Sequence, residues 1–139
     1  MVAKPKVMID INIVLDVLQR REPFYETSMR LLVNAETGRI HGWLAAHSLT
    51  TLFYLIAKDQ TPEHARTALI SLLQFIRVAT VDQAIIGQAL NLPYRDFEDA
   101  VQMMAAVQGK LDFLVTRNPK DYQPALIPVL QPVEFLATL

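Results

Sequence analysis

Polar side chains with the potential for chemistry directly follow the first apolar segment of the chain. Residues 6–9 (KVMI) are almost wholly apolar, and Asp10, Asn12 and Asp16 come after them. Carboxylates are rarely buried unless something compensates their charge. Asp10 therefore either caps the helix that follows or holds a positively charged group, and both interpretations stay open.

A second acidic group precedes another apolar segment. Asp96, Glu98 and Asp99 stand before residues 100–107, which are nearly all apolar. Asp96 is a candidate N-cap, with the other two acids in the first turn, where the helix dipole favours anions. We interpret Asp99 differently, because a carboxylate at the head of a helix buried on most sides faces a polar pocket rather than open water.

Short apolar strands alternate with amphipathic helices along the chain. Strands are expected at residues 7–10, 40–44, 77–80, 112–116 and 129–130. Helices are expected at 13–18, 25–37, 49–58, from 62, at 81–90 and at 96–108. This alternation predicts an α/β fold, a three-layer α/β/α sandwich with a central, mainly parallel sheet. Sites in such folds collect at the carboxyl ends of strands, where Asp10 and the Thr116–Asn118 segment both lie.

Composition restricts the possible functions. The 139 residues fit one domain, 1–139, and 52% of them are hydrophobic. The absence of cysteine excludes disulfides and thiolate metal sites, and a net charge of −1 provides no global basic field for nucleic acid. Because no apolar run reaches the roughly 18 residues of a membrane span, we expect a cytoplasmic protein without a membrane partner.

Three sequence blocks resemble the signature blocks of the PIN domain family. They are DINIVLD at 10–16, DFEDA at 96–100 and DFLVTRNPKDY at 112–122, in the order and spacing of VapC-type toxins. The resemblance covers essentially the whole chain. It implies an α/β/α nuclease whose acidic pocket binds Mg²⁺ or Mn²⁺, acting as a metal-dependent endoribonuclease and as the toxin of a toxin–antitoxin pair. RNA, a second copy in a homodimer and an antitoxin protein are the implied partners.

The resemblance also assigns roles to individual residues. Asp10 and Asp99 match metal-binding acids, and these two with Asn118 are the expected catalytic residues. Asn118 stands where many relatives have another aspartate, and Thr51 aligns with a family glutamate on the helix after the second strand. An asparagine oxygen can still orient a metal-bound water, whereas Thr51 removes a full negative charge.

Other polar residues are expected around the pocket. Magnesium is a hard ion that prefers oxygen ligands, and the three histidines show no ligand spacing. The residues expected near the metal without binding it directly are Asn12, Asp16, Thr51, Asp96, Thr116 and Asp121. The residues expected to contact RNA are Arg95, Arg117 and Lys120, with Lys4, Lys6, Arg20 and Arg21 as a possible extension of this rim. Solvent-facing charges and helix caps are the alternative interpretation for each of them.

Two other functions remain open from the sequence. A PIN-like RNA-binding module with weakened catalysis is consistent with Thr51 and Asn118. A phosphatase with Asp10 as its nucleophile is disfavoured, because Asn12 replaces the second acid that such an enzyme needs for proton transfer.

Overall fold

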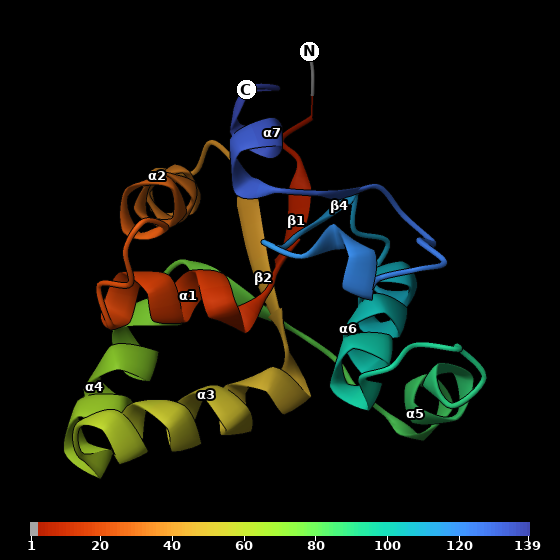
Figure 1. Ribbon diagram of the computed structural model, residues 1–139, viewed down its shortest axis with the longest axis horizontal. Helices are drawn as coiled ribbons and strands as arrows, with labels where there is room; N and C mark the ends of the chain where they lie inside the picture. The colour runs from red at the N-terminus through yellow and green to blue at the C-terminus, as the bar shows by residue number, and fades with distance from the viewer. Residues whose placement is uncertain (1–2) are drawn as a thin grey trace.

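The computed structural model, which describes residues 3–139, has a parallel sheet between two layers of helices (Figure 1). The sheet has five strands in the order β3-β2-β1-β4-β5. The strands are β1 (Lys6–Ile9), β2 (His41–Ala45), β3 (Ile76–Ala79), β4 (Phe113–Val115) and β5 (Val129–Leu130). The helices are α1 (Ile11–Leu18), α2 (Tyr25–Glu36), α3 (Ala46–Asp59), α4 (Pro62–Leu72), α5 (Gln83–Ala89), α6 (Phe97–Gln108) and α7 (Pro132–Leu136), with a 3₁₀ turn at Pro119–Asp121. The α/β fold predicted from the sequence is confirmed.

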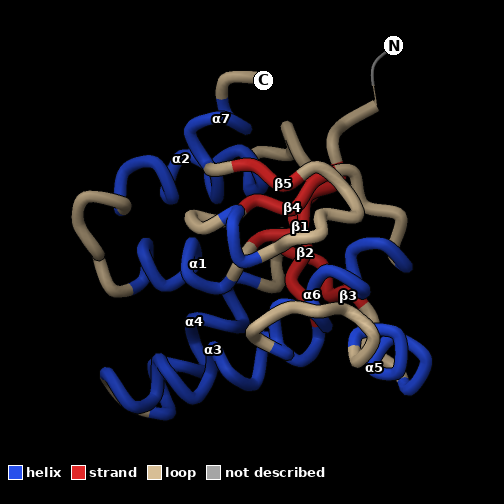
Figure 2. The backbone as a smooth tube through the Cα atoms, turned by 45° about the vertical axis from the view of Figure 1, so that its right-hand side comes forward, coloured by secondary structure: helices blue, strands red, loops and turns tan. Residues whose placement is uncertain are grey.

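The two faces of the sheet bury different helices (Figure 2). Val7 and Ile9 of the central strand pack in one core with residues of α1, α2, α3, α4 and α7. Met8, between them, points to the opposite face and packs with residues of α6. Successive side chains of a strand point to opposite faces, so a strand buried on both sides has the continuous apolar sequence seen here.

Helix boundaries follow the capping residues. Asp10 is the N-cap of α1 and accepts a hydrogen bond from the backbone nitrogen of Asn12, so α1 begins at Ile11, two residues earlier than expected. Thr61 caps α4 as predicted. Helix α3 begins at Ala46, three residues before the expected start, and its N-cap Ala45 provides no side-chain cap that the sequence could have revealed.

The strand register brings the polar segments together. Ile9 at the end of β1 pairs with Val115 at the end of β4, so Asp10 and Thr116 are the next residues on neighbouring parallel strands. Helix α3 begins directly after β2, on the other side of β1. Within residues 3–139, every helix is too short or too polar to cross a membrane.

Candidate active site

Asp10 is both a helix cap and a member of a buried polar cluster. Its Oδ1 accepts the capping hydrogen bond from Asn12. Its Oδ2 accepts a hydrogen bond of 2.7 Å from the hydroxyl of Thr116, which is fully buried. Asp10 is only 9% exposed, so the helix cap is confirmed, and the binding of a positively charged group by the same side chain stays a prediction.

A tyrosine hydroxyl lies between Asp10 and Asp99. The Tyr122 hydroxyl oxygen is 3.0 Å from Asp99 Oδ1 and 3.5 Å from Asp10 Oδ2. The Gln102 side chain donates a hydrogen bond of 2.8 Å to this hydroxyl from within α6. Tyr122 is buried, and its single hydroxyl hydrogen can be given to only one carboxylate at a time. Two carboxylates from distant parts of the chain therefore converge on one atom.

The electrostatics of this cluster disfavour negative charge. Burial raises the pKa of Asp99 to about 7; the Tyr122 hydrogen bond opposes the rise, and the charges of Asp96, Asp10 and Asp121 add to it. Burial also raises the pKa of Asp10, against the hydrogen bond from Thr116. Removing carboxylates from water and placing them together are both costly, so a positive charge bound here would be strongly stabilised.

The donor set is compatible with a hard divalent cation. Asp10 and Asp99 offer carboxylate oxygens, the ligands that Mg²⁺ and Mn²⁺ prefer. Within residues 3–139, no group of three or more histidine or acidic side chains is arranged to enclose a metal ion. Two carboxylates suit Mg²⁺, because this ion usually keeps several of its waters.

Glu98 faces the position where the sequence lacks an acid. The Thr51 hydroxyl of α3 lies 3.4 Å from Glu98 Oε1 and donates to it. In the same region His47 Nε2 lies 3.0 Å from the backbone oxygen of Glu98. A carboxylate from the first turn of α6, which the sequence suggested only as a partner of the helix dipole, therefore lies beside Thr51.

Asp96, Asn118 and Asp121 lie around the cluster and are all exposed. Asp96 caps α6 by accepting a hydrogen bond from the Glu98 backbone nitrogen, as predicted. Asn118 is exposed, and its backbone nitrogen donates to the Thr116 hydroxyl, so this segment supports Thr116. Asp121 is exposed at the end of the 3₁₀ turn, and its charge acts on Asp99. A direct catalytic role for Asn118 stays a prediction.

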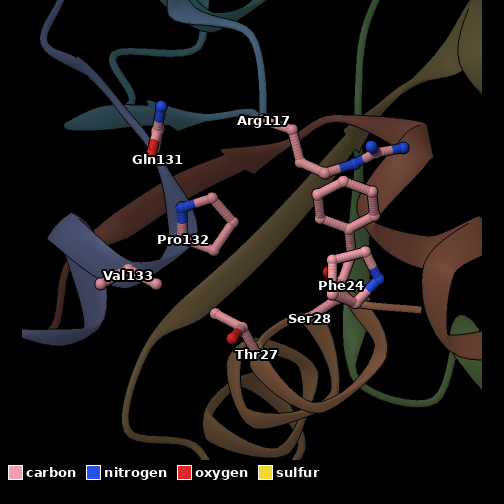
Figure 3. Close-up of a pocket in the computed structure, with 8 residues that line it drawn as sticks. Phe24, Thr27, Ser28, Arg117, Gln131, Pro132 and Val133 are labelled. Carbon is pink, nitrogen blue, oxygen red and sulfur yellow. The ribbon is translucent and has the colours of Figure 1, made fainter. Parts of the chain in front are cut away.

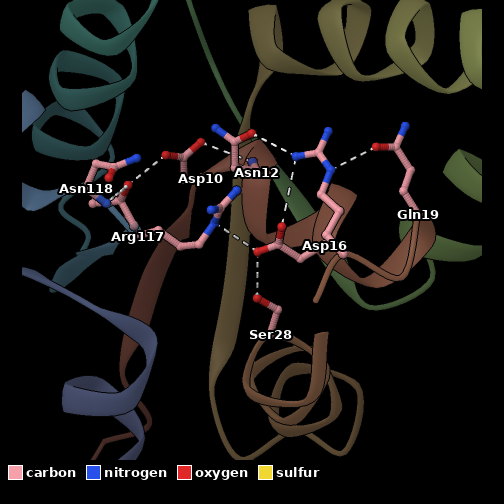
Figure 4. Close-up of polar contacts among 9 residues, drawn as sticks. Asp10, Asn12, Asp16, Gln19, Ser28, Arg117 and Asn118 are labelled. Carbon is pink, nitrogen blue, oxygen red and sulfur yellow. Dashed lines mark hydrogen bonds and ion pairs between the residues drawn. The ribbon is translucent and has the colours of Figure 1, made fainter. Parts of the chain in front are cut away.

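Asp16 and Arg117, which the sequence analysis treated separately, form an ion pair (Figure 4). Asp16 is completely buried, and its Oδ2 lies 3.0 Å from Arg117 Nε and 3.0 Å from the donating Ser28 hydroxyl. Burial raises the pKa of Asp16, while the Ser28 hydrogen bond and the two nearby arginines oppose the rise. Arg117 is therefore held by an ion pair and is not a freely solvated charge, and its expected contact with RNA stays a prediction. Arg95 and Lys120 are exposed.

Sequence reasoning missed two buried residues of the site, Tyr122 and Gln102. Tyr122 closes the third signature block, and Gln102 is a polar residue inside an otherwise apolar helix. A polar side chain in such a helix indicates a buried partner, so Gln102 carried a usable signal. Its partner could not be named, because Tyr122 lies 20 positions further along the chain.

Comparisons with known proteins agree with this fold. The family profile described as "PIN domain" matches residues 6–120, and a comparison with curated proteins gives no match. A toxin–antitoxin complex from Klebsiella pneumoniae contains a similar chain, with a TM-score of 0.68 and 21% identity over 91% of this chain and 97% of that one. FitAcB from Neisseria gonorrhoeae has a TM-score of 0.67 and 19% identity, over 91% of this chain and 98% of that one. VapC20 from Mycobacterium tuberculosis is described as a sarcin–ricin loop cleaving toxin. It has a TM-score of 0.62 and 16% identity, over 78% of this chain and 86% of that one.

These TM-scores show a shared fold, and the profile match covers most of the chain. The protein belongs to the PIN domain family.

Proposed function

We propose that this protein is a metal-dependent endoribonuclease and the toxin of a toxin–antitoxin pair. The observation that carries the proposal is the meeting of Asp10 and Asp99 at the Tyr122 hydroxyl. PIN-domain nucleases generally use divalent metals, and this acidic cluster combines hard oxygen ligands with a raised pKa at Asp99.

The proposed roles follow from the contacts. Asp10 and Asp99 would hold Mg²⁺ or Mn²⁺, with Tyr122 and Thr116 fixing the orientation of their carboxylates. When bound, the ion neutralises charge on the phosphoryl oxygens and activates a water for attack. The hydrogen bond of 3.4 Å from the Thr51 hydroxyl to Glu98 supports a role for Glu98 in orienting water on the α3 side of the cluster.

The proposed binding partners of this protein are inferred by analogy with its structural relatives. Solved structures of similar fold include a toxin–antitoxin complex and VapBC from Salmonella typhimurium bound to DNA. These relatives support an antitoxin as a partner of this chain. RNA as substrate and a homodimer as the working form are part of the same proposal.

The direct test is cleavage of a labelled circular RNA by the purified chain. An endonuclease linearises a circle, which an exonuclease cannot do. We expect linear product with Mg²⁺ or Mn²⁺ and none with EDTA. Cleavage that persists in EDTA would contradict the proposal.

A second candidate function is favoured by the two departures from the family pattern. Thr51 and Asn118 leave the site with fewer acids than the resemblance predicts. A PIN-like module with weakened catalysis would bind RNA and leave the circle intact with either metal. The same experiment, with binding measured in parallel, distinguishes the two functions.

Tyr122→Phe is expected to weaken Mn²⁺ binding by about tenfold, in the range found when a group that orients metal ligands is removed. The change deletes the hydroxyl between the two carboxylates and leaves the Gln102 donor without its acceptor. Isothermal titration of the metal-free protein measures the effect. Tyr54→Phe, on the exposed surface of α3, is the matched control. Unchanged affinity in the Tyr122 variant would show that this hydroxyl does not organise the site.

A further inference from the structure

Two arginines lie on either side of one buried carboxylate next to the acidic pocket (Figure 4). Arg117 Nε is 3.0 Å from Asp16 Oδ2, and Arg21 Nη1 is 3.9 Å from Asp16 Oδ1. A carboxylate with no exposed surface requires compensation of its charge. Two guanidinium groups around one carboxylate overcompensate it and leave the group with one net positive charge.

The backbone directs Arg21 toward the pocket. Arg20 adopts a left-handed conformation with φ of 49°, which is uncommon for a residue other than glycine. After this turn the Arg21 side chain lies beside α1. Arg21 Nε donates a hydrogen bond to Gln19, and Arg21 Nη1 donates one of 3.3 Å to Asn12 Oδ1. Asn12 is also the residue whose backbone nitrogen binds Asp10. Asn12 therefore links Arg21 to Asp10 of the acidic cluster. The Arg21 side chain is 36% exposed.

Arg117 is held by Asp16 and by the Phe24 ring and remains accessible. Its guanidinium group lies 3.9 Å from the centre of the Phe24 ring (Figure 3). The preceding residue, Thr116, donates a hydrogen bond to Asp10. It borders a pocket of about 310 Å³ that Phe24, Ser28 and Pro132 also line. Within residues 3–139 its Nε has no hydrogen-bond partner, because the contact with Asp16 lacks hydrogen-bond geometry. The side chain is 22% exposed.

We propose that Arg21 and Arg117, positioned by Asp16, bind one phosphate of the RNA strand next to the phosphate that is cleaved at Asp10 and Asp99. This inference rests on the proposed function and adds a subsite to it. An acidic pocket repels a polyanion, so a nearby positive group is needed to hold the strand. Guanidinium groups suit this task because their planar donors match phosphate oxygens.

RNA binding measured against salt concentration tests the arginines. We expect Arg21→Gln and Arg117→Gln each to weaken binding of a single-stranded RNA oligonucleotide about tenfold in EDTA, where no cleavage occurs. Each should reduce the slope of log K against log salt by about 0.7, the value for one phosphate on a single strand. Because both arginines share that phosphate, the double variant should lose no more slope than either single variant. Arg66→Gln, on α4 over the Phe53 ring, is the matched control and should leave binding unchanged.

Asp16→Asn separates positioning from simple charge. The substitution adds a net positive charge to the cluster, so unspecific electrostatics would tighten RNA binding. Positioning of the arginines by Asp16 predicts weaker binding, in a variant that circular dichroism shows to be folded. Tighter binding by the folded variant would contradict the positioning role, and the arginine variants test the subsite even if this variant does not fold.

The failure of this inference can be told apart from the failure of the proposed function. If both arginine variants bind and cleave RNA like the unchanged protein, while Asp10→Asn does not cleave, the subsite is wrong and the nuclease stands. If the arginine variants keep RNA binding and lose only binding to poly-glutamate, the pair serves an acidic protein segment, and the inference is also wrong. If the unchanged protein neither binds nor cleaves RNA, both proposals fall.

Discussion

Asp10→Asn is expected to lower metal-dependent RNA cleavage by at least about 100-fold, comparable to the loss of a single group that stabilises charge in the transition state. Asparagine is as good an N-cap as aspartate, so the hydrogen bond to the Asn12 backbone nitrogen and the start of α1 are retained. The substitution therefore keeps the cap, removes one negative charge, and replaces the oxygen that accepts the Thr116 hydroxyl hydrogen bond with an amide group. Initial rates on a labelled RNA at fixed Mg²⁺ measure the loss.

Two comparisons make this result specific. Asp59→Asn removes a carboxylate at the exposed end of α3 and should cleave at the unchanged rate. Asp10→Ala should lose the same activity and, in addition, about 1 kcal/mol of stability, because alanine cannot cap the helix. An Asp10→Asn protein that cleaves within a few-fold of the original would exclude this carboxylate from the chemistry.

Metal ions and Asp99→Asn are both expected to stabilise the protein at neutral pH. Asp99 has a pKa of about 7 in the fold, above the ordinary aspartate value of 3.8. The folded state therefore binds this proton more tightly than the unfolded state, and the contribution of Asp99 to stability falls as pH rises from about 4 to about 7. Above that range the penalty is complete and no longer depends on pH. A bound cation offsets the penalty, and asparagine never incurs it.

Thermal unfolding measured at several pH values tests this prediction. In EDTA, the melting temperature of Asp99→Asn should exceed that of the unchanged protein at pH 8, and the difference should shrink toward pH 5. Metal at 100 times its Kd adds about 2.7 kcal/mol to the unchanged protein, a shift on the order of 10 °C for a domain of this size, and much less to the variant. Equal melting temperatures at both pH values, with no response to metal, would show that Asp99 is neither buried with other acids nor near a cation site.

The sequence sufficed to predict the fold and the edge of the sheet where the polar residues gather. Alternating apolar strands and amphipathic helices are local patterns, and the parallel topology follows from them. The N-caps Asp96 and Thr61 were predicted for the same reason, since a cap acts within three residues of its position. The start of α3 was missed because Ala45 gives no capping signal.

The contacts that complete the site join residues far apart in the chain, and no local pattern encodes them. Tyr122 meets Asp10 across 112 positions, and Thr51 meets Glu98 across 47. The ion pair between Asp16 and Arg117 is of the same kind, and it shows a fixed side chain where the alternative interpretation was a solvent-facing charge. Charged residues on helices and loops are usually solvent-exposed, so only the folded arrangement shows which of them are held in place.

Because Asp10 both caps α1 and belongs to the acidic cluster, the stability of the first turn of α1 depends on what the cluster binds. Oδ1 of this carboxylate caps the N-terminus of α1. Its Oδ2 faces the hydroxyl groups of Tyr122 and Thr116. Protonation or ligand binding at one oxygen must then change the charge on the other, and with it the strength of the hydrogen bond that the other oxygen accepts. Amide hydrogen exchange at the first turn of α1 should consequently report on what the pocket contains, giving a readout of ligand occupancy that needs no substrate.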